Sequence, residues 1–218
     1  MHPVELEIRG EISVRNISSM AKKLLSFGFH RSSTTRRTSV MSFGTVTCIK
    51  NDRQRITGKV RDIVDIRCRI TDGHAEVVGK IGPTNAANRV EISVPVSFDD
   101  LSRFAQLFGA MPFFTKVGSK ITENFVKDDI TVSLVRSPSG LAYIEIEKMA
   151  TRKSEQKNLA ELHRLASALN VDIWKTRQAF LDFCNLLTER DDWIFTGTPA
   201  DLKRLTREIK KSGSNRSF

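Results

Sequence analysis

Acidic and basic side chains alternate with aliphatic ones at the start of the sequence. Residues 4–10 read VELEIRG, so Glu5, Glu7 and Arg9 stand two positions apart. Residues two apart share one face of a β-strand, and the aliphatic residues between them share the other face. Neighbouring carboxylates are ligands for hard divalent metal ions, and a guanidinium group binds phosphate oxygens. The segment therefore predicts a strand whose polar face suits metal or phosphate chemistry, provided that other strands supply matching charges.

Four later segments repeat this alternation, but the sign of the charge differs between them. VDIRCRI, AEVVGKIG and RVEISVPV carry arginines and a lysine beside three acids, whereas LAYIEIEKM carries a second pair of glutamates. The charged residues on these polar faces are Asp65, Arg67, Arg69, Glu76, Lys80, Arg89, Glu91, Glu145 and Glu147. Like charges at neighbouring positions repel each other, so both glutamate pairs are expected opposite cations or a metal ion.

A solvent-facing sheet surface is the ordinary explanation for any one of these strands, because charges commonly pair across strands there. Taken together, the strands favour an arrangement in which their charged faces meet. The glutamate pairs belong to the first and last strands, and the cations belong to the strands between them. If the sheet closes into an antiparallel β-barrel, we expect the charges to line its interior. A salt-bridged interior with no chemistry is the alternative.

Turn signals and alternating runs predict mainly antiparallel β structure for the first two thirds of the chain. Asp72-Gly73 between two alternating runs is typical of a β-hairpin. TSVMSFG and TVTCIK predict two strand pieces joined at Gly44. Further strands are expected at 116–125 and 130–137. The predicted fold class is α+β; if its antiparallel sheet closes into a barrel, the barrel forms a charged tunnel and is covered by helices.

Helical patterns lie between the strands and dominate the end of the chain. Residues 17–25 have the spacing of one amphipathic helix, and Ser97 with Asp100 predicts the capped start of another that ends at Gly109. Three apolar stripes after residue 154 predict a helical extension. We therefore expect a tunnel domain over 1–150 and a helical extension over 151–218 packed on it, with a flexible tail after residue 211.

Composition narrows the class of protein. The chain has 218 residues, and 39% of them are hydrophobic, which is sufficient for a core. No apolar run is long enough to span a membrane, and no signal peptide is visible. The cysteines are too widely spaced for a Cys-x-x-Cys zinc site and are expected as reduced thiols: Cys48, Cys68 and Cys184. We expect a cytoplasmic protein.

The positive charge is concentrated in two stretches. The formal net charge is +10, and residues 31–61 hold eight Lys and Arg against Asp52 alone. Residues 201–218 hold six basic residues against two acidic ones. Such a surface attracts polyanions, so the segment 31–61 predicts polyanion binding, with a solvated loop as the alternative.

The charged segments resemble, in order, the motifs of the CYTH superfamily, the triphosphate tunnel metalloenzymes. VELEIRG looks like its opening Glu-x-Glu-x-Lys, with Arg9 in the lysine position. IRCRITDGHAEVVGKIG is similar to its Arg-x-Arg, turn and Lys-Gly segment, and RVEISVPV to its Arg-x-Glu strand. GLAYIEIE resembles its closing Glu-x-Glu. The resemblance covers residues 4–148.

Two positions depart from the family pattern. Val135 stands where the family usually has an aspartate, ten residues before the final Glu-x-Glu. Lys120 matches the first position of a Lys-x-Arg motif, whose second position holds Thr122. The Asp- and Tyr-rich segment that usually follows the first helix has no match.

The resemblance implies a Mg²⁺- or Mn²⁺-dependent reaction on a triphosphate. It implies a metal-binding set of Glu5, Glu7, Glu91, Glu145 and Glu147. It implies a phosphate-binding set of Arg9, Arg67, Arg69, Lys80, Arg89 and Lys120. The catalytic group would be Glu5, Glu7, Arg9, Glu145 and Glu147.

Three functions agree with this resemblance. The first is a triphosphatase that acts on inorganic triphosphate, a nucleoside or thiamine triphosphate, or an RNA 5′ end, and releases orthophosphate. The second is an adenylate cyclase of class IV type, which needs a base pocket. The third is a non-catalytic module that binds polyphosphate or nucleic acid.

Overall fold

The chain forms two compact units in the computed structural model, which describes residues 4–47, 60–81, 90–151 and 154–213. The first unit comprises Met1–Arg37 and Ser119–Asp191, and the second comprises Thr38–Gly118 and Asp192–Phe218. Two strands, β2 (His30–Thr47) and β6 (Phe114–Lys127), contribute residues to both units.

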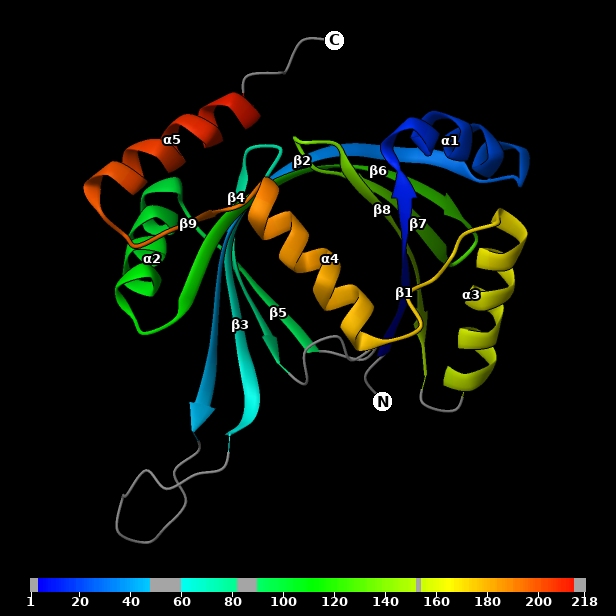
Figure 1. The fold of residues 1–218 in the computed structure, drawn as a ribbon, viewed down its shortest axis with the longest axis horizontal. Helices are drawn as coiled ribbons and strands as arrows, with labels where there is room; N and C mark the ends of the chain where they lie inside the picture. Colours follow the sequence, from blue (N-terminus) through cyan, green and yellow to red (C-terminus); the bar gives the residue numbers. More distant parts are fainter. Residues whose placement is uncertain (1–3, 48–59, 82–89, 152–153, 214–218) are drawn as a thin grey trace, which may run out of the picture. The chain divides into compact units, whose positions relative to one another are not determined.

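The strands of the described residues form one sheet with the hydrogen-bonded order β1-β8-β7-β6-β2-β3-β4-β5, and β9 pairs with β6 (Figure 1). The remaining strands are β1 (Val4–Ser13), β3 (Val60–Thr71), β4 (His74–Ile81), β5 (Val90–Pro95), β7 (Ile130–Arg136), β8 (Leu141–Ala150) and β9 (Trp193–Ile194). The pairings β1–β8, β7–β8, β6–β7, β3–β4, β4–β5 and β6–β9 are antiparallel. The predicted antiparallel α+β fold class is confirmed. The closed tunnel, which involves both units, stays a prediction.

The helices of the described residues lie largely where the apolar patterns place them. They are α1 (Ile17–Ser26), α2 (Phe98–Ala110), α3 (Glu155–Leu169), α4 (Arg177–Arg190) and α5 (Pro199–Gly213), with a short 3-10 helix at Val14–Asn16. None of these helices combines the length and the apolar run that a membrane-spanning helix needs.

The first unit buries the aliphatic face of β1 and β8. Leu6 and Ile146 are fully buried, and they pack in one cluster with Leu24 of α1 and Leu162 of α3. Because aliphatic residues alternate with charged ones along both strands, this packing turns the charged residues to the other face of the sheet. The predicted alternation is confirmed here.

The second unit has its own core, in which α2 and α5 pack with strand residues. Leu101 of α2, Leu205 of α5 and Cys68 of β3 are almost completely buried in one cluster. The aliphatic face of β5 differs from the expectation of a face covered by helices, because Ile92 and Val94 are each 53% exposed.

Local signals were confirmed at the turns and caps. Asp72 and Gly73 have φ values of 48° and 86°, which are the two left-handed residues of a tight hairpin turn. Ser97 caps α2, since its Oγ accepts the backbone N–H of Asp100 at 3.1 Å. The helix continues one residue beyond the predicted end at Gly109.

Other boundaries differ from the prediction. The two strand pieces expected on either side of Gly44 are one continuous strand, β2, because cross-strand pairing overrides the weak strand propensity of a single glycine. The two-residue strand β9 has no signal in the sequence. The helices after residue 150 fall into both units, α3 and α4 into the first and α5 into the second. The functional division at residue 150 stays a prediction.

The C-terminal tail and the cysteines are only partly described. Helix α5 extends through Gly213, and the rest of the expected flexible tail lies outside the described residues. Cys68 and Cys184 are free thiols, and burial raises the pKa of Cys68 to about 12. Cys48 lies outside the described residues.

Candidate active site

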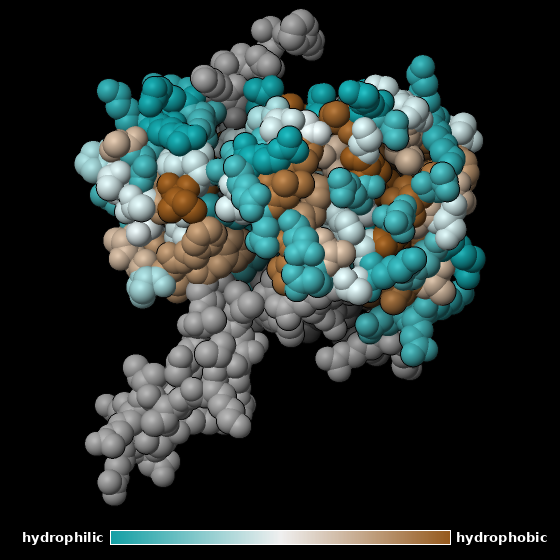
Figure 2. Space-filling view, in the orientation of Figure 1, coloured by the Kyte–Doolittle hydropathy of each residue, from teal (hydrophilic) through white to brown (hydrophobic). Residues whose placement is uncertain are grey.

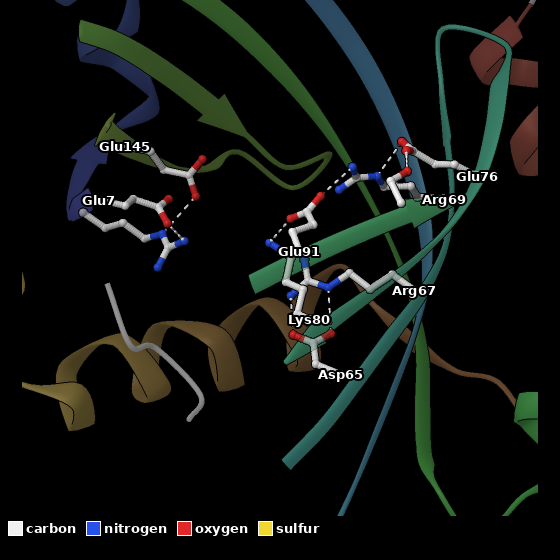
Figure 3. Close-up of polar contacts among 10 residues, drawn as sticks. Glu7, Asp65, Arg67, Arg69, Glu76, Lys80, Glu91 and Glu145 are labelled. Atoms are coloured by element: carbon white, nitrogen blue, oxygen red, sulfur yellow. Dashed lines mark hydrogen bonds and ion pairs between the residues drawn. The ribbon is translucent and has the colours of Figure 1, made fainter. Parts of the chain in front are cut away.

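The polar face of β1 and β8 gathers four of the predicted site residues in the first unit. The antiparallel register sets Glu7 opposite Glu147 and Arg9 opposite Glu145. Arg9 donates from Nε to Glu145 Oε1 at 3.0 Å, and its Nη2 pairs with Glu7 (Figure 3). One guanidinium group therefore holds two carboxylates that come from different strands. Glu5 lies two residues before Glu7 in β1 and pairs in register with Met149.

The two carboxyl groups titrate very differently. Burial, followed by the charge of Glu145, raises the pKa of Glu7 to about 8, although Arg9 opposes this shift. Burial also acts to raise the pKa of Glu145, but Lys120 and Arg9 overcome it and lower that pKa to about 2. Carboxyl pairs that share a small volume behave in this way, because both cannot ionise at low cost. The raised pKa of Glu7 favours a proton that stays on the pair to a higher pH than on an ordinary glutamate.

Lys120 of β6 joins the same group. Its Nζ donates to the hydroxyl of Tyr143 at 3.0 Å and lies 5.7 Å from the centre of that ring. Burial and the charge of Glu145 raise the pKa of Tyr143, so the phenol stays neutral. Burial disfavours a charged Arg9, yet Glu7 and Glu145 raise the pKa of Arg9 further, so it stays cationic. The first unit therefore brings Lys120 and Arg9 to the acidic pair.

Helix α4 and the segment before it cover this polar face. The sequence predicted helices of the extension packed on the tunnel domain, but not on its polar face. Trp174 and Phe183 pack with Tyr143 and with each other, and Phe180 packs with Trp174, with ring centroids 4.9–6.2 Å apart. The guanidinium carbon of Arg9 lies 5.0 Å from the centre of the Phe180 ring, within cation–π range. Figure 1 shows α3 and α4 on opposite sides of β1. An aromatic stripe is visible in the sequence, but nothing in it identifies Arg9 as the partner.

Because Gly10 has no side chain, the segment before α4 can approach β1 closely. A Cβ atom at Gly10 would lie 2.3 Å from the backbone oxygen of Asp172. Gly10 forms a β-bridge with Ile173, and the backbone N–H of Trp174 donates to the carbonyl of Arg9 at 2.9 Å. The glycine after the charged motif thus fixes the segment that carries Trp174.

The donor set in the first unit fits a divalent cation. Within the described residues, no three His, Cys, Asp or Glu side chains gather as a complete metal cage. Mg²⁺ commonly uses only one or two carboxylates and takes its other ligands from water and substrate phosphates. Glu7 and Glu145 supply two such carboxylates, and the proton that they retain marks the excess negative charge that a cation would neutralise.

The strand cations of the second unit are already paired with carboxylates. Arg67 makes two hydrogen bonds to Asp65, at 2.8 and 2.9 Å, and Asp65 is only 2% exposed. Arg69 donates to Glu76 at 2.6 Å and to Glu91 at 2.8 Å (Figure 3). The sequence placed these acids and bases on one face but assigned no role to Asp65 or Glu76.

Lys80 completes this network. Its Nζ lies 2.8 Å from Glu91 Oε2, so both oxygens of Glu91 contact cations. Burial acts to raise the pKa of Glu91, but Lys80 and Arg69 lower it. Three cations therefore meet three carboxylates, and a phosphate that binds here must share or replace these partners. Arg89 lies outside the described residues.

The two departures from the family pattern lie together in the first unit. Val135 of β7 pairs in register with Tyr143 on one side and with Thr122 on the other, and it is fully buried. An aliphatic residue therefore interrupts the polar face one row from Glu145. A cavity of about 490 Å³ lies further along β1 and is lined by Glu11 and by α4 residues, among them Asp182 and Phe183.

Comparison with known proteins adds evidence on the fold. No family model matches the sequence, and no curated protein is similar to it. A proposed adenylate cyclase from Vibrio parahaemolyticus superposes with a TM-score of 0.59 and 14% identity, over 84% of this chain and 99% of that one. The PH1819 protein from Pyrococcus horikoshii has a TM-score of 0.57 and 19% identity, over 85% and 99%. A conserved hypothetical protein from Pyrococcus furiosus has a TM-score of 0.55 and 14% identity, over 77% and 91%.

The chain shares the fold of these proteins. At such low identities the likeness carries no information on activity.

Proposed function

We propose that this chain is a CYTH-superfamily enzyme that hydrolyses a triphosphate with the help of Mg²⁺ or Mn²⁺. The order of charged motifs and the shared fold support membership of the superfamily. The observation that carries the activity is the partly buried pair Glu7 and Glu145, bridged by Arg9 and close to Lys120. Two carboxylates beside two cations suit the complex of a metal ion with a triphosphate better than they suit the metal ion alone or the triphosphate alone.

In this proposal Glu7 and Glu145 hold the metal ion, with Glu5 and Glu147 on the same two strands as further ligands. The ion would neutralise phosphate charge and activate water, as divalent ions do in phosphoryl transfer. Arg9 and Lys120 would bind the phosphate oxygens. Glu91 stays a predicted ligand, although its oxygens contact Lys80 and Arg69.

The reaction is a hydrolysis. A water molecule attacks the terminal phosphorus in line, the anhydride P–O bond breaks, and the proton that the water loses passes to a phosphate oxygen of the departing group. Orthophosphate and the shortened phosphate compound leave. Arg67, Arg69, Lys80 and Arg89 are the remaining proposed phosphate ligands. Catalysis would come mainly from positioning and charge neutralisation, because the described residues proposed for this site include no classical nucleophile.

An adenylate cyclase is the second candidate. The aromatic group of Tyr143, Trp174, Phe180 and Phe183 beside Arg9 supports it, because flat apolar rings next to a phosphate site suit a nucleobase. In this reaction the 3′-hydroxyl of ATP attacks the α-phosphorus and releases pyrophosphate.

Products distinguish these functions. The purified chain is incubated with Mg²⁺ or Mn²⁺ and with tripolyphosphate, ATP or RNA that ends in a 5′-triphosphate. Orthophosphate supports the hydrolase, whereas pyrophosphate with cyclic AMP supports the cyclase. If none of these substrates yields a product, the result supports the non-catalytic module and contradicts the proposed hydrolysis.

Glu7→Gln tests the acidic pair directly. We expect a loss of turnover of at least about a hundredfold, because a neutral amide removes a metal ligand but keeps the shape of the side chain. The matched control is Glu189→Gln, on the exposed surface of α4, which we expect to retain full activity. Unchanged turnover in Glu7→Gln would refute the metal assignment.

A further inference from the structure

Helix α5 presents a row of exposed cations that the proposed active site does not use. Lys203, Arg207 and Lys210 are exposed and stand four and three residues apart. This spacing places them on one face of the helix, over roughly two turns. Figure 2 shows hydrophilic surface over the helix.

The opposite face of α5 fixes the helix in the second unit. Leu205 is 2% exposed, and Leu202 and Ile209 pack against the same cluster. The apolar face is therefore unavailable to a lipid bilayer, into which an amphipathic helix inserts that face. This apolar packing leaves the cationic row, Lys203, Arg207 and Lys210, on the exposed face of α5. The packing does not depend on the charges of these three residues.

The acidic residues of α5 are engaged elsewhere. Asp201 accepts hydrogen bonds from the backbone and the hydroxyl of Thr196, both at 2.8 Å. Glu208 pairs with Arg204 at 3.2 Å and accepts from Trp193 Nε1 at 3.2 Å. These contacts lie outside the cationic row.

The row differs in this respect from the strand cations of the same unit. Arg67 and Arg69 contact carboxylates at 2.6–2.9 Å. No carboxylate of the described residues pairs with Lys203, Arg207 or Lys210. The uncompensated positive charge on the described surface of the second unit therefore lies on α5, and a polyanion can bind there without displacing an internal partner.

We propose that this face of α5 binds the phosphate backbone of a nucleic-acid strand. An extended row of cations matches an extended, regularly charged chain, whereas a small anion needs donors that converge on one point. Release of counterions from the strand would supply the binding energy and make it dependent on salt. The proposal goes beyond the proposed function, since none of the three residues belongs to the proposed site.

Binding is measured by fluorescence anisotropy on the full chain, with a labelled single-stranded RNA of about 16 nucleotides, a length that covers one compact binding site. The RNA has a 5′-hydroxyl end, and EDTA is present, so that neither a triphosphate nor a metal ion engages the proposed active site. The variant is Lys203→Gln/Arg207→Gln/Lys210→Gln. The control, Lys22→Gln/Lys157→Gln/Arg164→Gln, removes three exposed cations of the first unit and the same net charge.

We expect the α5 variant to bind at least about tenfold more weakly in 0.1 M salt and to lose about 2 from the slope of log K against log salt. The control should stay within about twofold of the wild type, and circular dichroism should show both variants folded. Three outcomes would overturn the proposal: no RNA binding by the wild type, equal losses in both variants, or binding confined to inorganic polyphosphate or anionic vesicles.

Discussion

At the residue scale, the pKa values of Glu7 and Glu145 shift in opposite directions because their cationic neighbours differ. Lys120 and Arg9 both act on Glu145, whereas Glu7 has Arg9 as its main cation and feels the charge of Glu145. A single arginine can therefore not neutralise both carboxylates. A proton that remains on this carboxyl pair indicates that the site accepts additional positive charge.

The folded chain without metal is expected to lose stability as the pH rises towards 8. The pKa of Glu7 is raised from 4.5 to about 8, so its contribution is fully present below pH 4.5 and is lost as the pH rises through 8. A shift of one pKa unit corresponds to about 1.4 kcal/mol, so we expect a loss of about 2 kcal/mol between about pH 5.5 and 7.5. Urea unfolding in EDTA measures it.

Glu7→Gln is the control for this prediction, because the amide remains neutral at every pH. The difference in unfolding free energy between the variant and the wild type should grow with pH in the variant's favour. Glu145, whose pKa is lowered to about 2, contributes in the opposite sense, and its stabilisation is lost only below pH 4.5. A constant difference across the range would contradict the assignment of the proton to Glu7.

At the element scale, the cover of the polar face depends on how closely the segment before α4 can approach β1. The bridge between Gly10 and Ile173 and the bond from Trp174 to Arg9 fix this segment. The aromatic residues of α4 then pack on Tyr143 and Arg9. One backbone position thus controls how the helix lies over the proposed site.

Gly10→Ala is expected to destabilise the chain by at least about 2 kcal/mol, because its Cβ would overlap the backbone of Asp172, which cannot move as a side chain does. Hydrogen exchange at the amide of Trp174 should accelerate. Gly79→Ala in β4 is the matched control, since no atom lies within 4 Å of its added Cβ. Equal effects of the two substitutions would show that the contact between Gly10 and Asp172 is unimportant.

At the scale of the whole molecule, the predicted site residues are distributed over two compact units. The acidic pair, Arg9 and Lys120 belong to the first unit, whereas Arg67, Arg69, Lys80 and Glu91 belong to the second. The second group is internally paired, which also suits a purely structural network. Substitutions in each unit can separate these roles.

Tripolyphosphate with Mg²⁺ is expected to raise the melting temperature of the wild type by about 5 °C at a concentration about a hundred times Kd. The increase should disappear in Glu145→Gln and fall by at least half in Arg69→Gln. Arg103→Gln, an exposed cation of α2, should retain it. If the increase in melting temperature is unchanged in Arg69→Gln, the ion pairs of Arg69 have a structural role only.

The sequence by itself determined the alternation of β1 and β8, the Asp72-Gly73 hairpin and the capped start of α2. These features depend on residues a few positions apart, so they can be read from local spacing. The predicted division into two strand pieces at Gly44 was wrong, since β2 continues through this residue. Pairing with neighbouring strands, not local propensity, decides whether a strand continues.

Only the tertiary structure decided which charges meet. Arg9 and Glu145 lie 136 residues apart, and only the β1–β8 register makes them partners. Likewise, local spacing placed Asp65 and Arg67 on one face, but the burial that makes this pair strong follows from the fold. Periodicity specifies the face of an element on which a side chain lies, whereas its partner depends on packing between distant segments of the chain.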